Sequence, residues 1–347
     1  HVRTAVRAPA ALAAPILAIS AIAGSMILAL SLTADWTTAM DRAQLHAPVV
    51  VETGGDDAVV ERLTGDPGID LADVRTTVAV GLGPEGEREP VEVVDLPAIE
   101  AARGLTAVRG DLDRLGGGDA VAVTETYALD EGAGVGDRVR LRIAGEVVRP
   151  VVVAVVRDAP DLYADVLVPR ALVGDRVGAA ITDLVFVMPG DVDVDALLAG
   201  TRARVLPAGR WIEEVDARTR AGNEVGLWVL LGPSGLYAGI AIVNAVLIGV
   251  TQRRRQFRTI ALLGATDAQL RRMAVWEAGS VGAAALLVGS AITLFVGWLV
   301  RHATTRDVPE VGLTVPVLPL AAIAATCAGL ALLAALVGSR RVVPRGA

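Results

Sequence analysis

The chain has 347 residues, of which 53% are hydrophobic, with a formal net charge of −7 and a mean hydropathy of +0.54. It has no lysine and a single cysteine, Cys327, which excludes both an internal disulfide and a P-loop, whose phosphate contacts need a lysine. The acidic balance argues against nucleic-acid binding, which needs a basic surface. The histidines, His1, His46 and His302, are far apart, so we expect no metal site and no bound cofactor.

Charge is divided unevenly along the sequence. Residues 34–222 hold 19 arginines and 34 acidic residues, whereas the rest of the chain holds 13 arginines and 5 acidic residues. Such a shift in composition marks domain boundaries. We therefore expect a cytoplasmic N-terminus and first transmembrane helix in 1–33, an extracytoplasmic domain in 34–222, and further membrane helices in 223–347.

The first apolar run, Pro9–Thr33, is uncharged and exceeds the roughly 20 residues that cross a bilayer core. Arg3 and Arg7 precede it and Asp35 follows it, which predicts a cytoplasmic start. A signal peptide is the alternative, but its apolar region is shorter, about 7–15 residues. Small residues suited to helix packing recur along the run, at Ala13, Gly24, Ser25 and Ala29.

Residues 34–222 predict a mixed α+β domain. Strands are expected at 48–53, at 91–96 and within 119–169, and short helices at 56–64 and 191–200. Ala144 and Gly145 suit a two-residue hairpin turn after an alternating strand at 139–143. The many acids of this block do not single out an opposed catalytic pair, so we expect no enzyme site.

A helical stretch, 210–224, leads directly into a second apolar run at 226–250. Pro233 lies inside that run and predicts a kink, with a re-entrant break as the alternative. Asn244 would lie at membrane depth, where its amide would seek a partner on another helix.

Two more spans are expected, at 273–300 and 315–338. Trp276 and Trp298 lie near the ends of the third span, as interfacial anchors do. Glu277, one turn inside it, would face protein or reach the interface, because a lipid-facing carboxylate is costly. Arg345 and its neighbouring arginines place the C-terminus in the cytoplasm, so all four spans agree with the positive-inside rule.

The short segment between the second and third spans, 251–272, is very basic. It holds six arginines against one acid, Asp267, as cytoplasmic loops do. Phe257, Ile260 and Gly264 recur at helical spacing, which predicts a short amphipathic helix that ends at Gly264. Thr266 followed by Gln269 predicts a capping box that begins the next helix. An ordinary basic loop is the alternative.

This segment resembles the signature of FtsX-like, MacB-type ABC transporter permeases. Asn244 is followed by the run QRRRQFRTIALLGATDAQLRRMAVWEA, in which an arginine-rich stretch precedes a Leu-Gly-Ala-Thr step. The order of strands and glycine turns in 119–169 is similar to the outer domain of these permeases. The resemblance implies that the loop contacts a separate ATPase. The residues implied in this coupling are Arg254, Arg255, Phe257, Ile260, Leu263, Gly264, Ala265 and Thr266.

The expected function is therefore that of a permease subunit in the plasma membrane of a bacterium. It would transmit ATP-driven change from a cytoplasmic ATPase to the outer domain, for export or for handling of lipids, lipoproteins or peptides. The implied partners are the ATPase, the bilayer and a second permease unit. That unit would be another copy or, since the sequence starts at His1, the other half of a longer chain. A sensor or regulator of a cell-wall hydrolase is the main alternative, and an anchored hydrolase a weaker one.

Overall fold

The computed structural model describes residues 7–83, 86–159, 161–174, 180–252, 266–304 and 315–342. The chain forms two compact units. The outer unit is Thr37–Asp216, and the membrane unit combines His1–Trp36 with Ala217–Ala347. Each is described by itself below.

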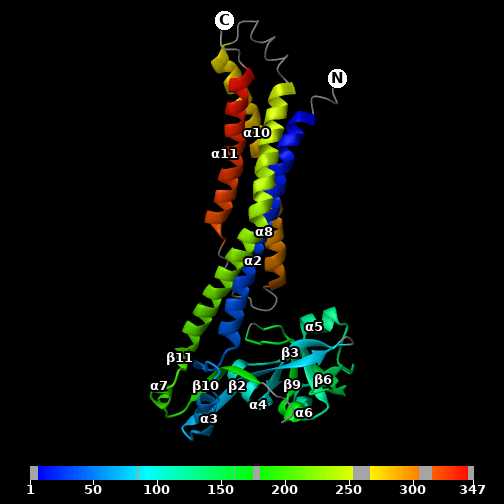
Figure 1. Ribbon diagram of the computed structural model, residues 1–347, viewed down its shortest axis with the longest axis vertical. Helices are drawn as coiled ribbons and strands as arrows, with labels where there is room; N and C mark the ends of the chain where they lie inside the picture. Colours follow the sequence, from blue (N-terminus) through cyan, green and yellow to red (C-terminus); the bar gives the residue numbers. More distant parts are fainter. Residues whose placement is uncertain are drawn as a thin grey trace. The chain divides into compact units, whose positions relative to one another are not determined.

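Long helices make up the described part of the membrane unit (Figure 1): α2 (Arg7–Gln44), α8 (Ala208–Gln252), α10 (Asp267–Thr304) and α11 (Val317–Val342). Three stretches are long and apolar enough to cross a membrane: Ala13–Gln44, Ala208–Ala245 and Gly279–Ala303. The apolar stretch described in α11, Val317–Leu330, is shorter. Three of the four expected spans therefore have helices of sufficient length, and the fourth remains a prediction.

The four helices share a buried core. It contains Ile16 of α2, Ile242 of α8, Ala285 of α10 and Cys327 of α11, each at most 5% exposed. These side chains come from all four helices, so the helices pack as one bundle.

Helices α2 and α10 approach each other through small residues. A Cβ added to Gly289 would lie 2.0 Å from Ser20 Oγ, and one added to Gly24 would lie 2.6 Å from Thr293 Oγ1. The Thr293 hydroxyl donates to the carbonyl oxygen of Ser20 at 3.2 Å. Small residues let two backbones meet closely inside a membrane, so the predicted packing role of Gly24 is confirmed.

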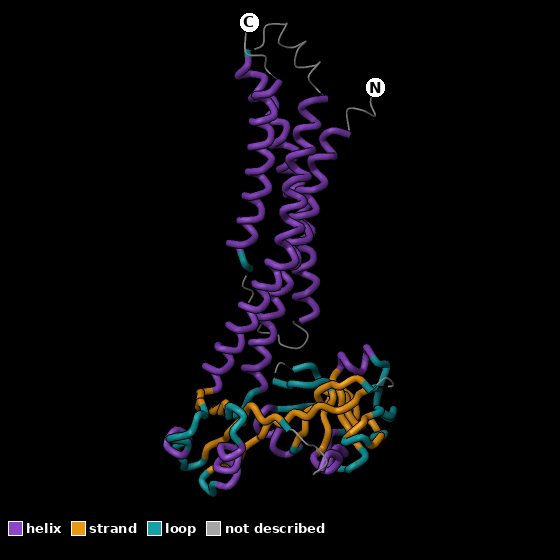
Figure 2. Tube along the Cα trace, in the orientation of Figure 1, coloured by secondary structure: helices purple, strands orange, loops and turns teal. Residues whose placement is uncertain are grey.

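The outer unit is built on one mixed sheet (Figure 2), in the order β11-β1-β10-β2-β3-β9-β5-β8-β4, with the hairpin β6–β7 joined to β2. Most neighbours are antiparallel, but β3–β9 and β5–β8 are parallel. This is the expected α+β class. The strands are β1 (Val49–Glu52), β2 (Ile69–Leu82), β3 (Glu87–Val94), β4 (Ala107–Gly110), β5 (Ala120–Thr124), β6 (Leu141–Ile143), β7 (Glu146–Val148), β8 (Val151–Val156), β9 (Val166–Pro169), β10 (Ile181–Pro189) and β11 (Arg204–Pro207).

Short helices flank this sheet: α3 (Asp57–Gly65), α4 (Leu96–Arg103), the 3₁₀ helix η1 (Leu112–Gly116), α5 (Glu125–Asp130), α6 (Arg170–Val173) and α7 (Val194–Leu197). The helix expected at 56–64 is α3, and the Asp56 side chain accepts from the amide of Ala58 at its start. The helix expected at 191–200 is shorter than predicted, because α7 covers only Val194–Leu197. Asp193 caps that single turn through the amides of Asp195 and Ala196.

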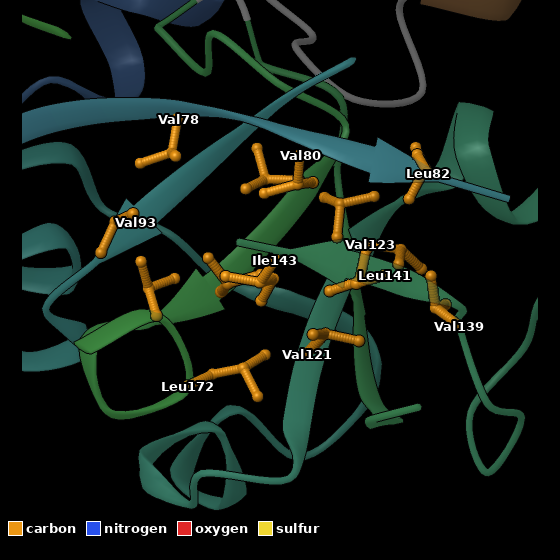
Figure 3. Packing of buried hydrophobic residues seen from close by; sticks show 14 of the residues in the cluster. Val78, Val80, Leu82, Val93, Val121, Val123, Val139, Leu141, Ile143 and Leu172 are labelled. Carbon is orange, nitrogen blue, oxygen red and sulfur yellow. The ribbon is translucent and has the colours of Figure 1, made fainter. Parts of the chain in front are cut away.

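The predicted hairpin is present between β6 and β7. Ala144 and Gly145 both have positive φ, 50° and 88°, as a tight turn of this type requires. The strand expected at 139–143 is shorter, since β6 begins at Leu141. Leu141 and Ile143 point into a core of valines and leucines from β2, β3, β5 and β8 (Figure 3).

Helix α8 is one continuous helix of 45 residues that contains the stretch expected at 210–224 and the second apolar run. It passes through Pro233 without interruption, so a re-entrant break is wrong. The Ser234 hydroxyl donates to the Leu230 carbonyl oxygen at 3.1 Å, which adds a hydrogen bond beside the proline. The kink at Pro233 remains a prediction.

Candidate functional site

The predicted coupling segment lies between the end of α8 at Gln252 and the start of α10 at Asp267. Of the coupling residues, only Thr266 is among the residues that the structure describes. The others, Arg254, Arg255, Phe257, Ile260, Leu263, Gly264 and Ala265, lie outside the described residues. Their proposed role therefore remains a prediction from the sequence.

The capping box at the end of this segment is confirmed. The amide of Thr266 donates to Gln269 Oε1 at 2.9 Å, and the amide of Gln269 donates to Thr266 Oγ1 at 3.4 Å. This reciprocal pair satisfies two backbone donors at the start of α10. It fixes the point at which the chain leaves the basic segment and enters the third apolar helix.

Of the two polar residues expected inside the membrane, Asn244 is exposed on the surface of α8. Among the described residues, no partner helix receives its amide, so the interhelical bond expected within this bundle is not found. Glu277 belongs to α10, and its side chain lies outside the described part of the structure.

The outer unit contains a buried charge cluster, which we define by Asp41, Asp73, Glu92, Arg103 and Asp161. All five are at most 6% exposed. Arg103 lies at its centre, with Nε 2.6 Å from Asp73 Oδ2 and Nη2 2.8 Å from Glu92 Oε1. Its Nη1 is 3.8 Å from Asp161 Oδ2 and donates to the Asp161 carbonyl oxygen at 3.2 Å.

Four elements and a loop bring this cluster together, and Asp41 comes from α2. Arg103 is the last residue of α4, Asp73 and Glu92 come from the neighbouring strands β2 and β3, and Asp161 lies on the loop between β8 and β9. The carbon of the Arg103 guanidinium lies 4.9 Å from the ring centre of Phe186. Burial lowers the pKa of Arg103, but the surrounding carboxylates outweigh that effect and raise it, so the guanidinium stays charged.

A second arginine borders the cluster. The Arg75 guanidinium pairs with Asp183 on β10, and its Nη1 donates to the carbonyl oxygen of Asp161 at 3.4 Å. It also lies 5.6 Å from the ring centre of Tyr163. The amide of Tyr163 in turn donates to Glu92 Oε2 at 2.9 Å. The loop that carries Asp161 and Tyr163 is thus held by both arginines.

Burial raises the pKa of two carboxyl groups of the cluster, Asp41 and Asp161. Burial raises the pKa of Asp41 to about 7, and the charge of Asp161 adds to this effect. Burial also raises the pKa of Asp161 to about 6, against the opposing effect of Arg103 and with that of Glu92. Asp41 belongs to the outer unit, beyond the uncharged run that ends at Thr33.

Sequence reasoning missed this cluster. Glu92 stands between Val91 and Val93 in a strand, which is the one local sign of a buried acid. Arg103 reads as an ordinary basic residue at the end of a helix. Nothing in the sequence shows that five distant residues meet, because their contacts depend on the order of the strands.

No metal-binding group of three or more His, Cys, Asp or Glu residues occurs in the part of the chain that the structure describes. Arg103 at the centre of the charge cluster and Arg75 at its border would both repel a metal cation. Ion pairs and hydrogen bonds of Arg103 hold the cluster together.

The C-terminal part of the chain is similar to a known protein family. Residues 229–345 match the family model described as FtsX-like permease C-terminal. None of the curated proteins compared with the chain matches it.

Two solved structures are similar to part of the chain. One is a domain assigned to a permease protein from Porphyromonas gingivalis, 20% identical, which covers 44% of this chain and 77% of that one with a TM-score of 0.30. The other is the extracellular domain of the noncanonic ABC-type transporter YknZ from Gram-positive bacteria, 13% identical, which covers 49% and 94% with a TM-score of 0.30.

The family match covers the last part of α8, all of α10 and α11, and the basic segment whose motif first pointed to this family. Residues 229–345 are therefore similar to the C-terminal domain of the FtsX-like permeases.

Proposed function

We propose that this chain is the permease subunit of an ABC transporter complex and works with a separate cytoplasmic ATPase. The observation that carries the proposal is the FtsX-like permease domain at 229–345. The sequence has no lysine and hence no P-loop lysine, so ATP hydrolysis is assigned to the partner subunit.

The route for transmission is α8. This helix starts directly after β11 of the outer unit and continues without a break to Gln252, next to the coupling segment. Because a continuous helix is stiff, it transmits a displacement from one end to the other. ATP binding would favour one of two conformations of the permease, and α8 would carry that preference to the outer unit.

The apolar helices support mechanical transmission rather than a hydrophilic pore. Each of the three long stretches contains an 18-residue window with at most two charged residues. A polar substrate would therefore be handled outside the membrane, by the outer unit, and export or the handling of lipids, lipoproteins or peptides fits this arrangement. A second permease unit, either another copy or the other half of a longer chain, completes the complex.

The proposed orientation follows from charge. Residues 34–222 would lie outside the cell, and the segment 251–272 and the C-terminus inside it, as the excess of arginine in the short segments requires.

Co-purification tests the proposal. Replacing Ile260 with Asp should detach the ATPase, because burying an unpaired carboxylate costs several kcal/mol, against about 1.5–3 kcal/mol for a buried aliphatic side chain. Gln252→Ala is the matched control on the same segment. If no ATPase co-purifies with the unaltered chain and a cell-wall hydrolase does, the sensor alternative replaces the transporter. If Ile260→Asp retains the ATPase as the control does, the segment is an ordinary basic loop.

A further inference from the structure

The residues directly after α2 are fixed to the end of α4 within the outer unit. The amides of His46 and Ala47 both donate to the carbonyl oxygen of Ala102 at 2.9 Å. Gly104 ends α4 in the left-handed region, with φ of 61°, and an added Cβ there would lie 2.8 Å from the carbonyl oxygen of Gln44. The close approach leaves room for glycine alone.

Asp41 lies one turn before this junction, and its buried carboxyl group is not fully hydrogen-bonded. The residue is 5% exposed, and its Oδ1 has no hydrogen-bond partner. Next to the junction, Gln44, Arg103 and Asp161 line a small cavity with room for about one water molecule. An unpaired buried carboxylate is costly, so the neutral form of Asp41 is favoured.

Carboxyl groups outnumber cations in these surroundings. The acids are Asp41 on α2, Asp73 on β2, Glu92 on β3, Asp161 on the β8–β9 loop and Asp183 on β10, with Asp95 at the start of α4 acting on Asp73 from the surface. The cations that face them are Arg103 on α4, Arg75 on β2 and Arg157 at the cavity. Arg103 and Arg75 are already bound by Asp73, Glu92 and Asp183.

We propose that the buried carboxyl group of Asp41, with Asp161 as its acidic neighbour, takes up a proton and forms a proton-controlled latch, which fastens the end of α2 to α4 within the outer unit. With the proton bound, the Asp41 carboxyl is neutral and its burial carries little penalty. Without it, two buried carboxylates repel each other and Asp41 Oδ1 remains unpaired. The latch is closed in mild acid and loosens as the pH rises.

The pH range follows from the burial of the two acids, which places the pKa of Asp161 at about 6 and that of Asp41 at about 7. Loosening therefore occurs as the pH rises through 6 to 7. The latch would therefore let acidity around the outer unit change how firmly the end of α2, within that unit, is held against α4. The inference does not depend on the proposed transporter function.

Hydrogen exchange in the full-length chain, reconstituted in nanodiscs, tests the latch. The peptide that covers 41–47 is followed from pH 5 to pH 8, and each rate is corrected for the intrinsic pH dependence of exchange. The open fraction should rise at least about tenfold over this range, as proton linkage requires. A wild-type chain whose corrected exchange does not change with pH overturns the proposal.

Variants identify the groups responsible. Asp41→Asn removes the charge but keeps the shape, and it should leave the segment protected at every pH. Asp130→Asn, an exposed acid in α5, is the matched control and should keep the wild-type pH dependence. His46 lies in the same peptide, so His46→Asn is the second control. Loss of the pH dependence in His46→Asn, or its survival in Asp41→Asn, overturns the assignment to the acid pair.

Discussion

Gly289 of α10 fits against Ser20 of α2 with no room for a side chain. An added Cβ would lie 2.0 Å from Ser20 Oγ and 2.9 Å from its Cβ. The Ser20 hydroxyl is itself fixed, since it donates to the carbonyl oxygen of Ile16 at 2.8 Å. Helix α10 therefore packs against α2 at one specific position along both helices. The carboxyl-terminal helices thus share a bundle with α2, which comes from the other end of the sequence.

Replacing Gly289 with Ala should destabilise the membrane unit. Alanine favours an isolated helix over glycine by roughly 0.5–1 kcal/mol, but overpacking at this contact costs about 1–3 kcal/mol. Gly279→Ala on the same helix is the control, because nothing lies within 4 Å of its added Cβ. Thermal unfolding of the full chain in detergent measures both. Equal stability of the two variants would mean that α2 and α10 do not meet at this level.

The buried charge cluster should be essential for folding of the outer unit. Arg103→Met leaves Asp73 and Glu92 buried without their cation, which costs about 3–5 kcal/mol. Adding Glu92→Gln should recover part of this loss, because it removes one of the unpaired charges. Hydrogen exchange of the strand β8 in the full chain reports the free energy of unfolding of this unit.

An exposed arginine provides the comparison. Arg204 pairs with Glu52 at 2.7 Å and with Glu214 at 2.9 Å at the surface. Arg204→Met should leave the exchange of β8 nearly unchanged, since exposed ion pairs contribute little. If Arg103→Met is as mild as Arg204→Met, the cluster does not hold the sheet together.

Much of this architecture could be predicted because its signals are local. Apolar runs of bilayer length give α2, α8 and α10, and Thr266 with Gln269 gives the start of α10. Ala144 and Gly145 gave the hairpin turn for the same reason, since the backbone preferences of two neighbouring residues decide it.

What could not be predicted depends on long-range order. The pairs β3–β9 and β5–β8 are parallel, and no local pattern states which strands become neighbours. Arg103 therefore meets Asp161, on the loop before β9, only in the folded sheet. Helix α7 was expected to be longer because the acids at 191–195 suggest a helix start, but a single turn forms before the chain bends at Gly200, whose φ is 84°.

Stability of the outer unit should fall as the pH rises from 5 to 8. In the folded state burial raises the pKa of Asp161 to about 6 and of Asp41 to about 7, from an ordinary value of 3.8. The folded state therefore binds more protons than the unfolded state between about pH 4 and 7, and stability decreases with pH across that window. Below it both states are protonated, and these two groups have no further effect.

The free energy of unfolding from the slowest exchanging amides of the outer unit, measured at each pH, checks this sign. Asp161→Asn should remove the lower part of the pH dependence, near pH 6. Asp130→Asn should leave the whole profile unchanged. A stability that increases between pH 5 and pH 8 would contradict the burial of two protonated acids.

Cysteine labelling should establish the orientation of the chain. Cys327 is buried in the helix bundle at 2% exposure, so Cys327→Ala gives a background for single probes. A cysteine at Asp130, which is exposed in the outer unit, should react with an impermeant reagent on intact cells. Cysteines at Arg255 and Arg345 should react only after the cells are permeabilised. Labelling of Arg255 from outside would reverse the proposed orientation and remove the ATPase from reach of the basic segment.

The capping box at Thr266 should matter for coupling more than for assembly. Thr266→Ala removes the side-chain acceptor for the amide of Gln269 and should cost about 0.5–2 kcal/mol at the first turn of α10. That loss is local, because the bundle core lies further along the helix, at Ala285. The permease should still insert and still bind its ATPase, whereas ATP hydrolysis should respond less to the outer unit.

Thr266→Ser restores the hydroxyl and should restore the response, which a change in side-chain volume alone would not explain. Exchange of the first-turn amides and the stimulated ATPase rate of the assembled complex measure the two effects separately. A frayed first turn with full stimulation would show that the beginning of α10 takes no part in transmission.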